Sequence, residues 1–287
     1  MSTQLQQQAN EVLDKILQQN GPEMDDYEMI TAIIDQLEDV ESFRKKLYRH
    51  ISPGTLFYHT YTKPRGYAGD YELIARLYSK SVSTNPKEVK WDLYYHSVPA
   101  TQAVRNRKHI LEKELLKYKD ENVRVLILGC GPSEDVFNFL SNHKHDHLHF
   151  DLLDMDADAL SYSEAITQSF SNQISFINAN ILRFSFDKSY DLIYASGLFD
   201  YFNDRVFQHI LKKIFPALNE KGKILIGNFA EDNPSRFVME KMADWVLHHR
   251  SPQKLRNLAI EVQPDSEKID VYSDATGINL FLEIQKS

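Results

Sequence analysis

The sequence predicts an α/β fold, in which a helical N-terminal domain precedes a mostly parallel β-sheet that ends in an antiparallel hairpin. From residue 122 onward, short apolar strand patterns alternate with helical patterns, which is typical of a parallel sheet covered on both faces. Near the C-terminus, Asp274-Ala-Thr-Gly277 separates two strand patterns and indicates a hairpin instead. We therefore expect a helical domain over residues 1–119 and a sheet domain over residues 120–287.

The N-terminal domain is expected to be helical because its apolar residues recur at helical spacing. One stripe ends before Gly21-Pro22, a second begins at Ile30 and continues with charged residues to about Tyr48, a third helix begins near Asp70, and a fourth runs from Pro99 to Tyr118. The first two stripes contain Ala9, Val12, Leu13, Ile16, Leu17, Ile30, Ile33, Ile34 and Leu37. We interpret these stripes as packing core, and not as a membrane or cofactor face.

Residues 58–71, between the second and third helices, have an unusual composition. This stretch holds two glycines, a proline, two cations and four tyrosines. Aromatic rings on a fixed turn would suit a lid over a flat, partly charged ligand. A well-packed surface loop explains the same composition, and both interpretations stay open.

The sheet domain alternates strand and helix patterns. The expected strands are 123–128, 148–153, 174–178, 191–195 and 223–228, followed by 269–272 and 279–284 at the hairpin. The expected helices between them are 133–140, 157–169 and 204–218. Seven apolar or aromatic residues are expected either in a helix core, which is favoured, or in an acyl pocket. They are Phe199, Phe202, Phe229, Phe237, Met239, Met242 and Trp245.

A glycine turn follows the first strand and indicates a nucleotide site. The apolar strand stops at Gly129-Cys130-Gly131, where glycines let the backbone approach a ligand closely. Asp154 ends the next strand, at the distance expected of a carboxylate that binds ribose hydroxyls. Together the turn and the acid predict a Rossmann-like nucleotide site.

The turn also narrows the choice of nucleotide. No lysine follows Gly131 as a phosphate-binding loop requires, and Glu134 stands where a dinucleotide fingerprint has its third glycine. A ligand without a pyrophosphate needs neither feature. S-adenosylmethionine is such a ligand, with a ribose, an adenine and a methionine tail.

Composition excludes several classes of function. The formal net charge of −8 argues against broad electrostatic binding to nucleic acid or anionic membranes. No apolar run reaches membrane-spanning length, and no signal-peptide pattern opens the chain. We therefore expect a soluble cytoplasmic protein with a small-molecule substrate and no stable membrane insertion, and the sequence leaves a homo-oligomer open.

No metal site is expected. Cys130 is the single cysteine, which excludes an intrachain disulfide and a multi-cysteine zinc site. The alternating histidines are interpreted as a polar turn before a strand. They are His143, His145, His147 and His149. The acidic run from Asp154 fails as a calcium loop, because Ala159 and Ala165 stand where glycine and glutamate are needed.

Five motifs in order resemble those of class I S-adenosylmethionine-dependent methyltransferases. They are VLILGCGPSED, LLDMDADAL, FINANI, YDLIYASGLFDYF and LNEKGKILIGNF, and they cover roughly residues 120–287. The stretches TKPRGYAGDYELI and PATQAVRNRKHIL also resemble the PhcB-like group, whose members are described as making 3-hydroxypalmitic acid methyl ester. The resemblance implies methylation of the carboxylate of a small or fatty 3-hydroxy acid.

The resemblance implies roles for individual residues around the cofactor. The glycine turn would pass beneath the methionine and ribose, Asp154 would bind the ribose, and the remaining residues would hold the adenine and border the sulfonium. The cofactor-binding set on the sheet domain is Gly129, Cys130, Gly131, Asp154, Met155, Asn180, Ile181, Ser196 and Gly197, with Asn178 as an alternative to Asn180. Ile127 stands where many relatives have an acid, so the methionine ammonium needs another partner.

The lid stretch and the fourth helix supply candidates for the methionine end. Tyr67, Asp70 and Tyr71 are proposed for the ammonium group. Arg107, or alternatively Arg105, is proposed for the carboxylate. Opposite charges would fix the orientation of that end.

The need for a catalytic base depends on the methyl acceptor. A carboxylate is its own nucleophile at neutral pH, whereas a hydroxyl or an amine needs a base. Asp200, Tyr201 and His248 are the candidate catalytic residues, with Glu231 a further residue of suitable type. The alternatives to a carboxylate methyltransferase are a hydroxyl or amine methyltransferase and a non-catalytic protein that binds the cofactor or a partner.

Overall fold

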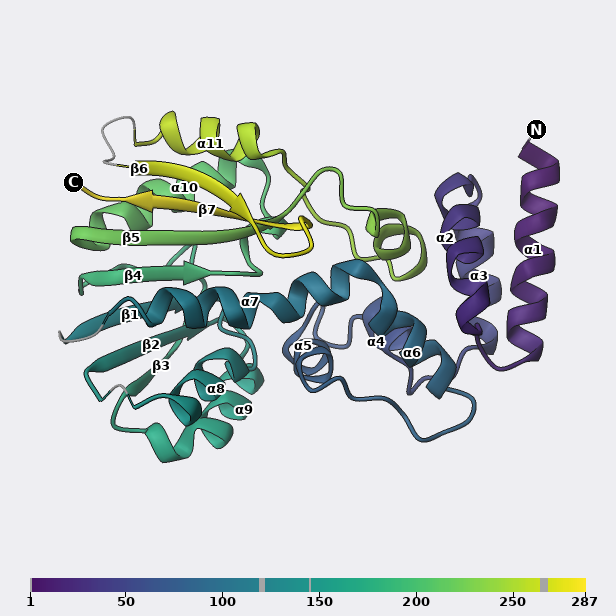
Figure 1. Ribbon diagram of the computed structural model, residues 1–287, viewed down its shortest axis with the longest axis horizontal. Helices are drawn as coiled ribbons and strands as arrows, with labels where there is room; N and C mark the ends of the chain where they lie inside the picture. Colours follow the sequence, from purple (N-terminus) through teal and green to yellow (C-terminus); the bar gives the residue numbers. More distant parts are fainter. Residues whose placement is uncertain (1, 119–121, 145, 264–267) are drawn as a thin grey trace. The chain divides into compact units, whose positions relative to one another are not determined.

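The computed structural model describes residues 2–118, 122–144, 146–263 and 268–287 and divides the chain into two compact units (Figure 1). The helical unit comprises Met1–Gln102 and Pro234–Val246, and the sheet unit comprises Ala103–Asn233 and Leu247–Ser287. The helical unit is therefore discontinuous in sequence. It receives a short segment from the far half of the chain.

The helical unit is built from short helices. They are α1 (Ser2–Gln18), α2 (Tyr27–Gln36), α3 (Val40–His50), α4 (Leu56–Thr62), α5 (Tyr71–Tyr78) and α6 (Val89–Ser97), with a π-helical turn, η5, at Val238–Met242. The expected helix near Asp70 is α5, for which Asp70 is the N-cap residue and accepts from Leu73 N. The second expected stripe is two helices, because the Asp39 side chain caps a new start at α3.

Hydrogen bonds to main-chain groups hold segment 234–246 in the helical unit. The Tyr48 hydroxyl donates to Met242 O at 2.8 Å, and Arg44 Nε donates to Lys241 O at 2.8 Å. Ala100 N donates to Ser235 Oγ at 2.9 Å. Of the residues expected in a helix core or an acyl pocket, Met239, Met242 and Trp245 are buried here, with exposed fractions of 4%, 1% and 5%, whereas Phe237 is 39% exposed. The three buried residues belong to the core of this unit.

Among the described residues, seven strands form one sheet in the order β3-β2-β1-β4-β5-β7-β6. The strands are β1 (Val123–Leu128), β2 (Leu148–Asp154), β3 (Ile174–Asn178), β4 (Tyr190–Ala195), β5 (Leu218–Phe229), β6 (Lys268–Ser273) and β7 (Asn279–Gln285). Strands β1 to β5 pair in parallel, whereas β7 pairs antiparallel with both β5 and β6. The predicted fold class is confirmed.

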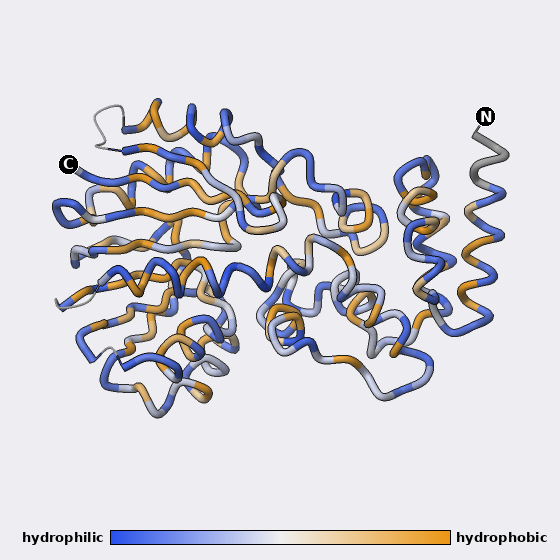
Figure 2. The backbone as a smooth tube through the Cα atoms, viewed as in Figure 1, coloured by the Kyte–Doolittle hydropathy of each residue, from blue (hydrophilic) through white to orange (hydrophobic). Residues whose placement is uncertain are grey.

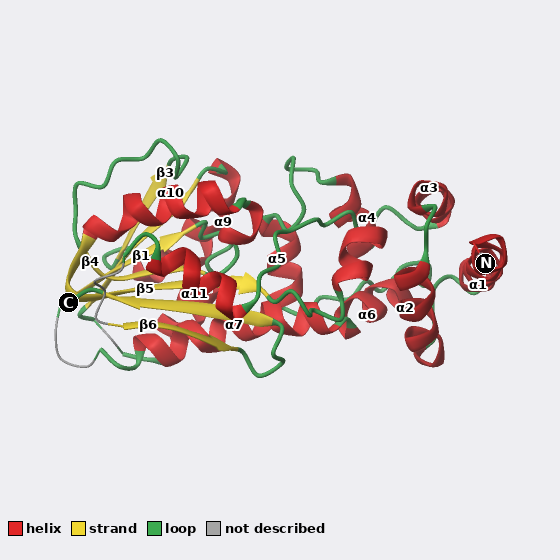
Figure 3. Cartoon of the chain, turned by 90° about the horizontal axis from the view of Figure 1, so that it is seen from above, coloured by secondary structure: helices red, strands yellow, loops and turns green. Residues whose placement is uncertain are grey.

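Helices cover both faces of the sheet (Figure 3). They are α7 (Pro99–Leu115), α8 (Glu134–Asn142), α9 (Ala157–Thr167), α10 (Asp204–Ile214) and α11 (Pro252–Ile260). Apolar side chains from α10 and α11 share one buried cluster with the sheet, and those from α7, α8 and α9 share the other. Figure 2 shows the matching apolar positions along the strands.

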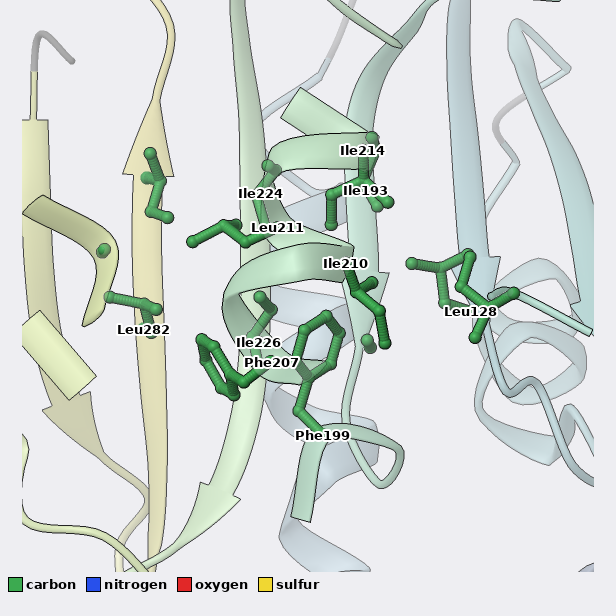
Figure 4. Close-up of a cluster of buried hydrophobic side chains, with 14 of the residues drawn as sticks. Leu128, Ile193, Phe199, Phe207, Ile210, Leu211, Ile214, Ile224, Ile226 and Leu282 are labelled. Atoms are coloured by element: carbon green, nitrogen blue, oxygen red, sulfur yellow. The ribbon is translucent and has the colours of Figure 1, made fainter. Parts of the chain in front are cut away.

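Close packing of α10 on the sheet fixes the loops at the strand ends. Phe207, Ile210 and Leu211 of α10 face Ile224 and Ile226 of β5 (Figure 4), and all five side chains have an exposed fraction of 0%. Burying side chains of this size contributes about 1.5–3 kcal/mol each. The carboxyl ends of the parallel strands are therefore rigidly placed.

The division between the units differs in position from the expected boundary at residues 119–120. From Ala103 onward, α7 belongs to the sheet unit. Leu111 and Leu115 are fully buried in the same cluster as β1, and the Tyr194 hydroxyl of β4 donates to Arg107 O at 3.0 Å. Helix α7 is thus a covering layer of the sheet, which its helical pattern alone did not indicate.

Candidate functional site

The glycine turn joins β1 to α8 and leaves open space beside its backbone. Gly129 and Gly131 have φ angles of +63° and +53°, in the left-handed region that favours glycine. Gly129 N and Cys130 N both donate to Leu153 O, at 2.8 and 3.1 Å, and fix the turn to the end of β2. A Cβ placed on Gly131 would meet nothing within 4 Å. A ligand therefore has room to lie against Gly131.

Asp154 ends β2 beside this turn, where the sequence placed it. Its Oδ2 accepts from Gly131 N at 2.9 Å and its Oδ1 accepts from Asp156 N at 3.0 Å. The side chain is 7% exposed, and burial raises its pKa. A carboxylate has about four acceptor positions, so Asp154 retains capacity for two hydroxyl groups of a ligand.

The residues beyond Asp154 present an apolar surface next to polar groups. Met155 is 62% exposed, so its side chain is accessible to a ligand. The Asn178 amide donates to Asp154 O at 3.3 Å and to Met155 O at 3.2 Å, so it positions both residues. Asn180 is exposed and its Oδ1 accepts from Leu182 N, whereas Ile181 is buried. An aromatic base could pack on Met155.

Arg107 of α7 reaches the carboxyl end of β4. A Cβ on Gly197 would lie 2.6 Å from Arg107 Nη1, so the guanidinium lies directly against this backbone and next to Ser196. Arg107 Nε donates to Asn279 Oδ1 at 3.1 Å, and the guanidinium lies over the Phe229 ring at 5.2 Å from its centroid. The side chain is 4% exposed.

One nitrogen of this guanidinium is available for a ligand. Among the described residues, Arg107 Nη2 has no hydrogen-bond partner. Its nearest ion-pair partner is Asp200, with 3.9 Å between Nη2 and Oδ2. A buried donor without an acceptor is energetically unfavourable, which makes Arg107 a candidate for binding an anionic group of a ligand.

Asp200 lies beneath this edge and has an exposed fraction of 1%. Its Oδ1 accepts from Phe229 N at 2.7 Å, and its carbonyl oxygen accepts from His248 N at 2.8 Å. Burial raises the pKa of Asp200 to about 6, while the nearby charges of Arg107 and Arg250 oppose that shift. Of the other candidate catalytic residues, His248 is exposed and Tyr201 is partly buried.

The lid candidates belong to the helical unit. Asp70 is 1% exposed, and each of its oxygens lies 2.9 Å from Nε2 of His59. The Tyr71 hydroxyl accepts from Arg65 Nη2 at 3.0 Å, and Tyr67 is partly buried. Helix α4 already occupies the first part of the stretch 58–71. The role of these three residues in cofactor binding stays a prediction.

Sequence reasoning missed three polar residues at the carboxyl edge. Asn279 begins β7 and is fully buried, and Arg250 donates to Asn228 Oδ1 at 2.6 Å and to Asp204 Oδ1 at 3.0 Å. No local pattern marks Asn279, Asn228 or Arg250, because their partners lie far along the chain. Asp135 was also missed, although it is the last residue of the motif VLILGCGPSED.

No metal site is found among the residues that the structure describes. His143 Nε2 pairs with Glu112 Oε1 at 2.8 Å and His147 Nε2 with Tyr118 O at 3.1 Å, while His145 lies outside the described residues. Burial raises the pKa of the Cys130 thiol well above its ordinary value, which disfavours a nucleophilic thiolate. Within the described ranges, no helix is long and apolar enough to cross a bilayer.

The mostly parallel sheet, with a glycine turn and an acid at the carboxyl ends of its first two strands, has the arrangement of a Rossmann-like nucleotide-binding fold. The family model described as "Methyltransferase domain" matches residues 119–269. The chain belongs to the class I S-adenosylmethionine-dependent methyltransferase family, and its cofactor is S-adenosylmethionine. Among curated protein sequences, none matches this chain.

Solved structures share the fold at low sequence identity. A possible exported protein from Bordetella parapertussis is 15% identical with a TM-score of 0.67, covering 97% of this chain and 96% of its own. The S-adenosylmethionine-dependent methyltransferase SibL is 14% identical with a TM-score of 0.53, covering 89% and 76%. Magnesium protoporphyrin IX methyltransferase from Synechocystis PCC 6803, solved with S-adenosylhomocysteine, is 10% identical with a TM-score of 0.54, covering 75% and 93%.

The residues at the carboxyl edge fit this cofactor. The open side of Gly131 gives room for the thioether chain, and Asp154 has acceptor capacity for the ribose hydroxyls. The exposed Met155 offers a surface for the adenine, and the unpartnered Nη2 of Arg107 suits a carboxylate. The enzyme class is thus shown by the family, and the site is consistent with it.

Proposed function

We propose that this methyltransferase methylates the carboxylate of a small or fatty acid, with a 3-hydroxy acid as the preferred class. The burial of Asp200 carries this proposal. With 1% of its surface exposed and Oδ1 bound to Phe229 N, Asp200 is poorly placed to take a proton from an acceptor. A carboxylate acceptor needs no such base, because its pKa of about 4 leaves it ionised at neutral pH.

Each residue of the edge then has a role in binding and orientation. Asp154 accepts from the ribose hydroxyls, Met155 packs on the adenine with Asn180 and Ile181 at its edge, and Arg107 binds the methionine carboxylate. Gly129, Cys130 and Gly131 lie beneath the thioether, and Ser196 and Gly197 border the reacting methyl group. When bound, the cofactor would supply a methyl group activated by its sulfonium sulfur: the acceptor oxygen would bond to the methyl carbon in line as the carbon–sulfur bond breaks, and S-adenosylhomocysteine would leave. Orientation of the two reactants supplies much of the acceleration.

The product identifies the acceptor group. Purified protein with S-adenosylmethionine is incubated with 3-hydroxyhexadecanoic acid, and in parallel with hexadecan-1-ol and hexadecylamine as acceptors of equal chain length. We expect methylated product from the acid only, detected by mass spectrometry and releasing methanol on mild alkaline treatment, as an ester does. An alkali-stable ether, or an N-methyl product, would contradict carboxylate methylation.

The variant His248→Ala tests whether a base takes part. For a carboxylate acceptor we expect kcat within about twofold of the unchanged enzyme, because no proton is transferred. Loss of a general base would instead lower kcat by roughly a hundredfold or more. Such a loss, with cofactor affinity unchanged, would favour a hydroxyl or amine acceptor.

A further inference from the structure

Asp135 is a buried carboxylate beside the glycine turn. It has no role in the cofactor site as described so far. It lies in the first turn of α8, four residues after Gly131, and is 8% exposed. Its Oδ1 accepts from Val136 N at 2.9 Å. In the described part of the chain, no cation forms an ion pair with it, although Arg107 and Lys108 are close enough to lower its pKa.

Two buried groups of opposite charge therefore lie close enough to influence each other at the same edge of the sheet. Among the described residues, Arg107 Nη2 has no hydrogen-bond acceptor, and its ion-pair partner Asp200 is 3.9 Å away. Asp135 accepts from Val136 N, and its burial outweighs the nearby charges of Lys108 and Arg107. Removing a charge from water without pairing it is unfavourable, so such groups are retained where a ligand supplies the counter-charge. A ligand with one cation and one anion close together, an α-amino acid, would satisfy both.

We propose that Asp135 accepts hydrogen bonds from the ammonium group of the cofactor's methionine part, while Arg107 binds its carboxylate. This assignment rests on the proposed role of Arg107 in the function above. It gives the ammonium group a partner in the sheet unit itself, in place of the missing acid at Ile127.

Other acidic groups around the turn are already engaged. Asp154 accepts from two backbone N–H groups at the ribose position, and Glu134 Oε1 accepts from the Tyr162 hydroxyl at 3.1 Å. Asp70 of the helical unit is paired with His59. Burial keeps the neighbouring Cys130 thiol protonated, so it offers no negative charge. The remaining acceptor positions of Asp154 are assigned to the ribose, so Asp135 is the described carboxylate beside the turn that is left for the ammonium group.

Comparing two ligands isolates the amino-acid end of the cofactor. S-adenosylhomocysteine contains that end, whereas 5′-deoxy-5′-methylthioadenosine has the same adenine, ribose and thioether but lacks it. By isothermal titration we expect Asp135→Asn to weaken S-adenosylhomocysteine binding about tenfold to a hundredfold. Binding of the methylthio nucleoside should change by less than about twofold.

Asp154→Asn is the matched control at the same edge. It should weaken both ligands by a similar factor, because both contain the ribose that Asp154 binds. A deaminated analogue of S-adenosylhomocysteine, which keeps the carboxylate, completes the cycle. The unchanged protein should bind this analogue as weakly as Asp135→Asn binds S-adenosylhomocysteine. Asp135→Asn should bind the analogue no more weakly than the unchanged protein does.

Each outcome separates this inference from the proposed function. Unchanged S-adenosylhomocysteine affinity in Asp135→Asn, or an equal loss for both ligands, would overturn the role of Asp135 and leave carboxylate methylation intact. An enzyme that methylates only alcohols while Asp135→Asn shows the selective loss would overturn the proposed acceptor alone. If Asp135→Asn does not fold, Asp135→Ser takes its place, since its hydroxyl can still accept from Val136 N.

Discussion

Asp135 illustrates how a binding residue can oppose folding. Burial raises its pKa from 3.8 to about 6, so the folded protein holds this proton more tightly than the unfolded chain does. Stability therefore falls as pH rises through the interval between about 4 and 6, and the whole penalty is present at neutral pH. A residue kept at such an energetic disadvantage is expected to serve a ligand.

Asp135→Asn should make the cofactor-free protein more stable at neutral pH, by about 1–3 kcal/mol. The amide can still accept from Val136 N but has no charge to bury. Urea unfolding at several pH values measures the effect, and the difference between variant and unchanged protein should vanish near pH 4. A variant that is less stable at neutral pH would contradict the argument.

Asp204→Asn is a control that should change the stability of the protein at neutral pH in the opposite direction. Although burial acts to raise its pKa, hydrogen bonds from Lys254 and Arg250 hold the pKa of Asp204 below its ordinary value. Its charge therefore favours folding at neutral pH, and that contribution is lost as pH falls through its lowered pKa. The variant should be less stable than the unchanged protein at neutral pH.

Gly131 and Gly277 form a matched pair that separates backbone strain from ligand contact. Both have positive φ angles, +53° and +76°, and a Cβ on either would meet nothing within 4 Å. Alanine at either position should therefore lower stability by a similar amount, about 1–2 kcal/mol. Only Gly131→Ala should also weaken S-adenosylhomocysteine binding, because its methyl group would enter the space left for the cofactor.

Chemical denaturation and isothermal titration on the two glycine variants give both quantities. Equal cofactor affinity in the two variants would mean that the ligand does not lie against Gly131. Weakened affinity in Gly277→Ala would mean that strain in the hairpin reaches the site.

At the scale of elements, the spacing of apolar residues predicted those strands and helices whose pattern lies within the element itself. Apolar strands such as β1 and β4 and the amphipathic α10 were found close to their expected bounds. The early part of β5 was not predicted, because residues 219–222 are polar and its pairing with β4 is irregular near Tyr190. Helix α11 was also missed, although the Ser251 cap and Pro252 at its first turn are a recognisable start signal.

The site shows the same division between local and distant information. Gly129, Gly131 and Asp154 follow strand ends, so their meeting at one edge could be predicted from spacing. The position of the Arg107 guanidinium could not be predicted, because it depends on a hydrogen bond to Asn279, which lies 172 residues farther along the chain. Its contact with Gly197 likewise depends on how α7 packs on the sheet.

At the scale of the whole molecule, the discontinuous helical unit is the feature that sequence patterns could not reveal. Segment 234–246 begins five residues after the end of β5, yet Val238, Met239 and Met242 are buried in the unit of the N-terminal helices. An apolar segment has the same local appearance whichever core it joins. The binding of cofactor groups by the sheet unit therefore has to be separated experimentally from any contribution of Tyr67, Asp70 and Tyr71.

A shortened chain makes that separation. It spans residues 103–287 with segment 234–246 replaced by a Gly/Ser linker of equal length, which removes the helical unit completely. Because Asp154, Met155, Arg107 and Asp135 all remain, we expect it to fold and to bind S-adenosylhomocysteine within about threefold of the full chain. Circular dichroism and isothermal titration measure the two properties.

The same shortened chain with segment 234–246 retained is the matched control. Its buried apolar residues would have lost their helical partners, so it should bind a hydrophobic dye and aggregate more readily. If the linker version folds but loses more than about tenfold in cofactor affinity, the helical unit contributes to binding. That contribution would then be located with three variants of the full chain, Tyr67→Phe, Asp70→Asn and Tyr71→Phe. Weaker cofactor binding in any of them would favour the lid interpretation of residues 58–71 over a purely structural loop.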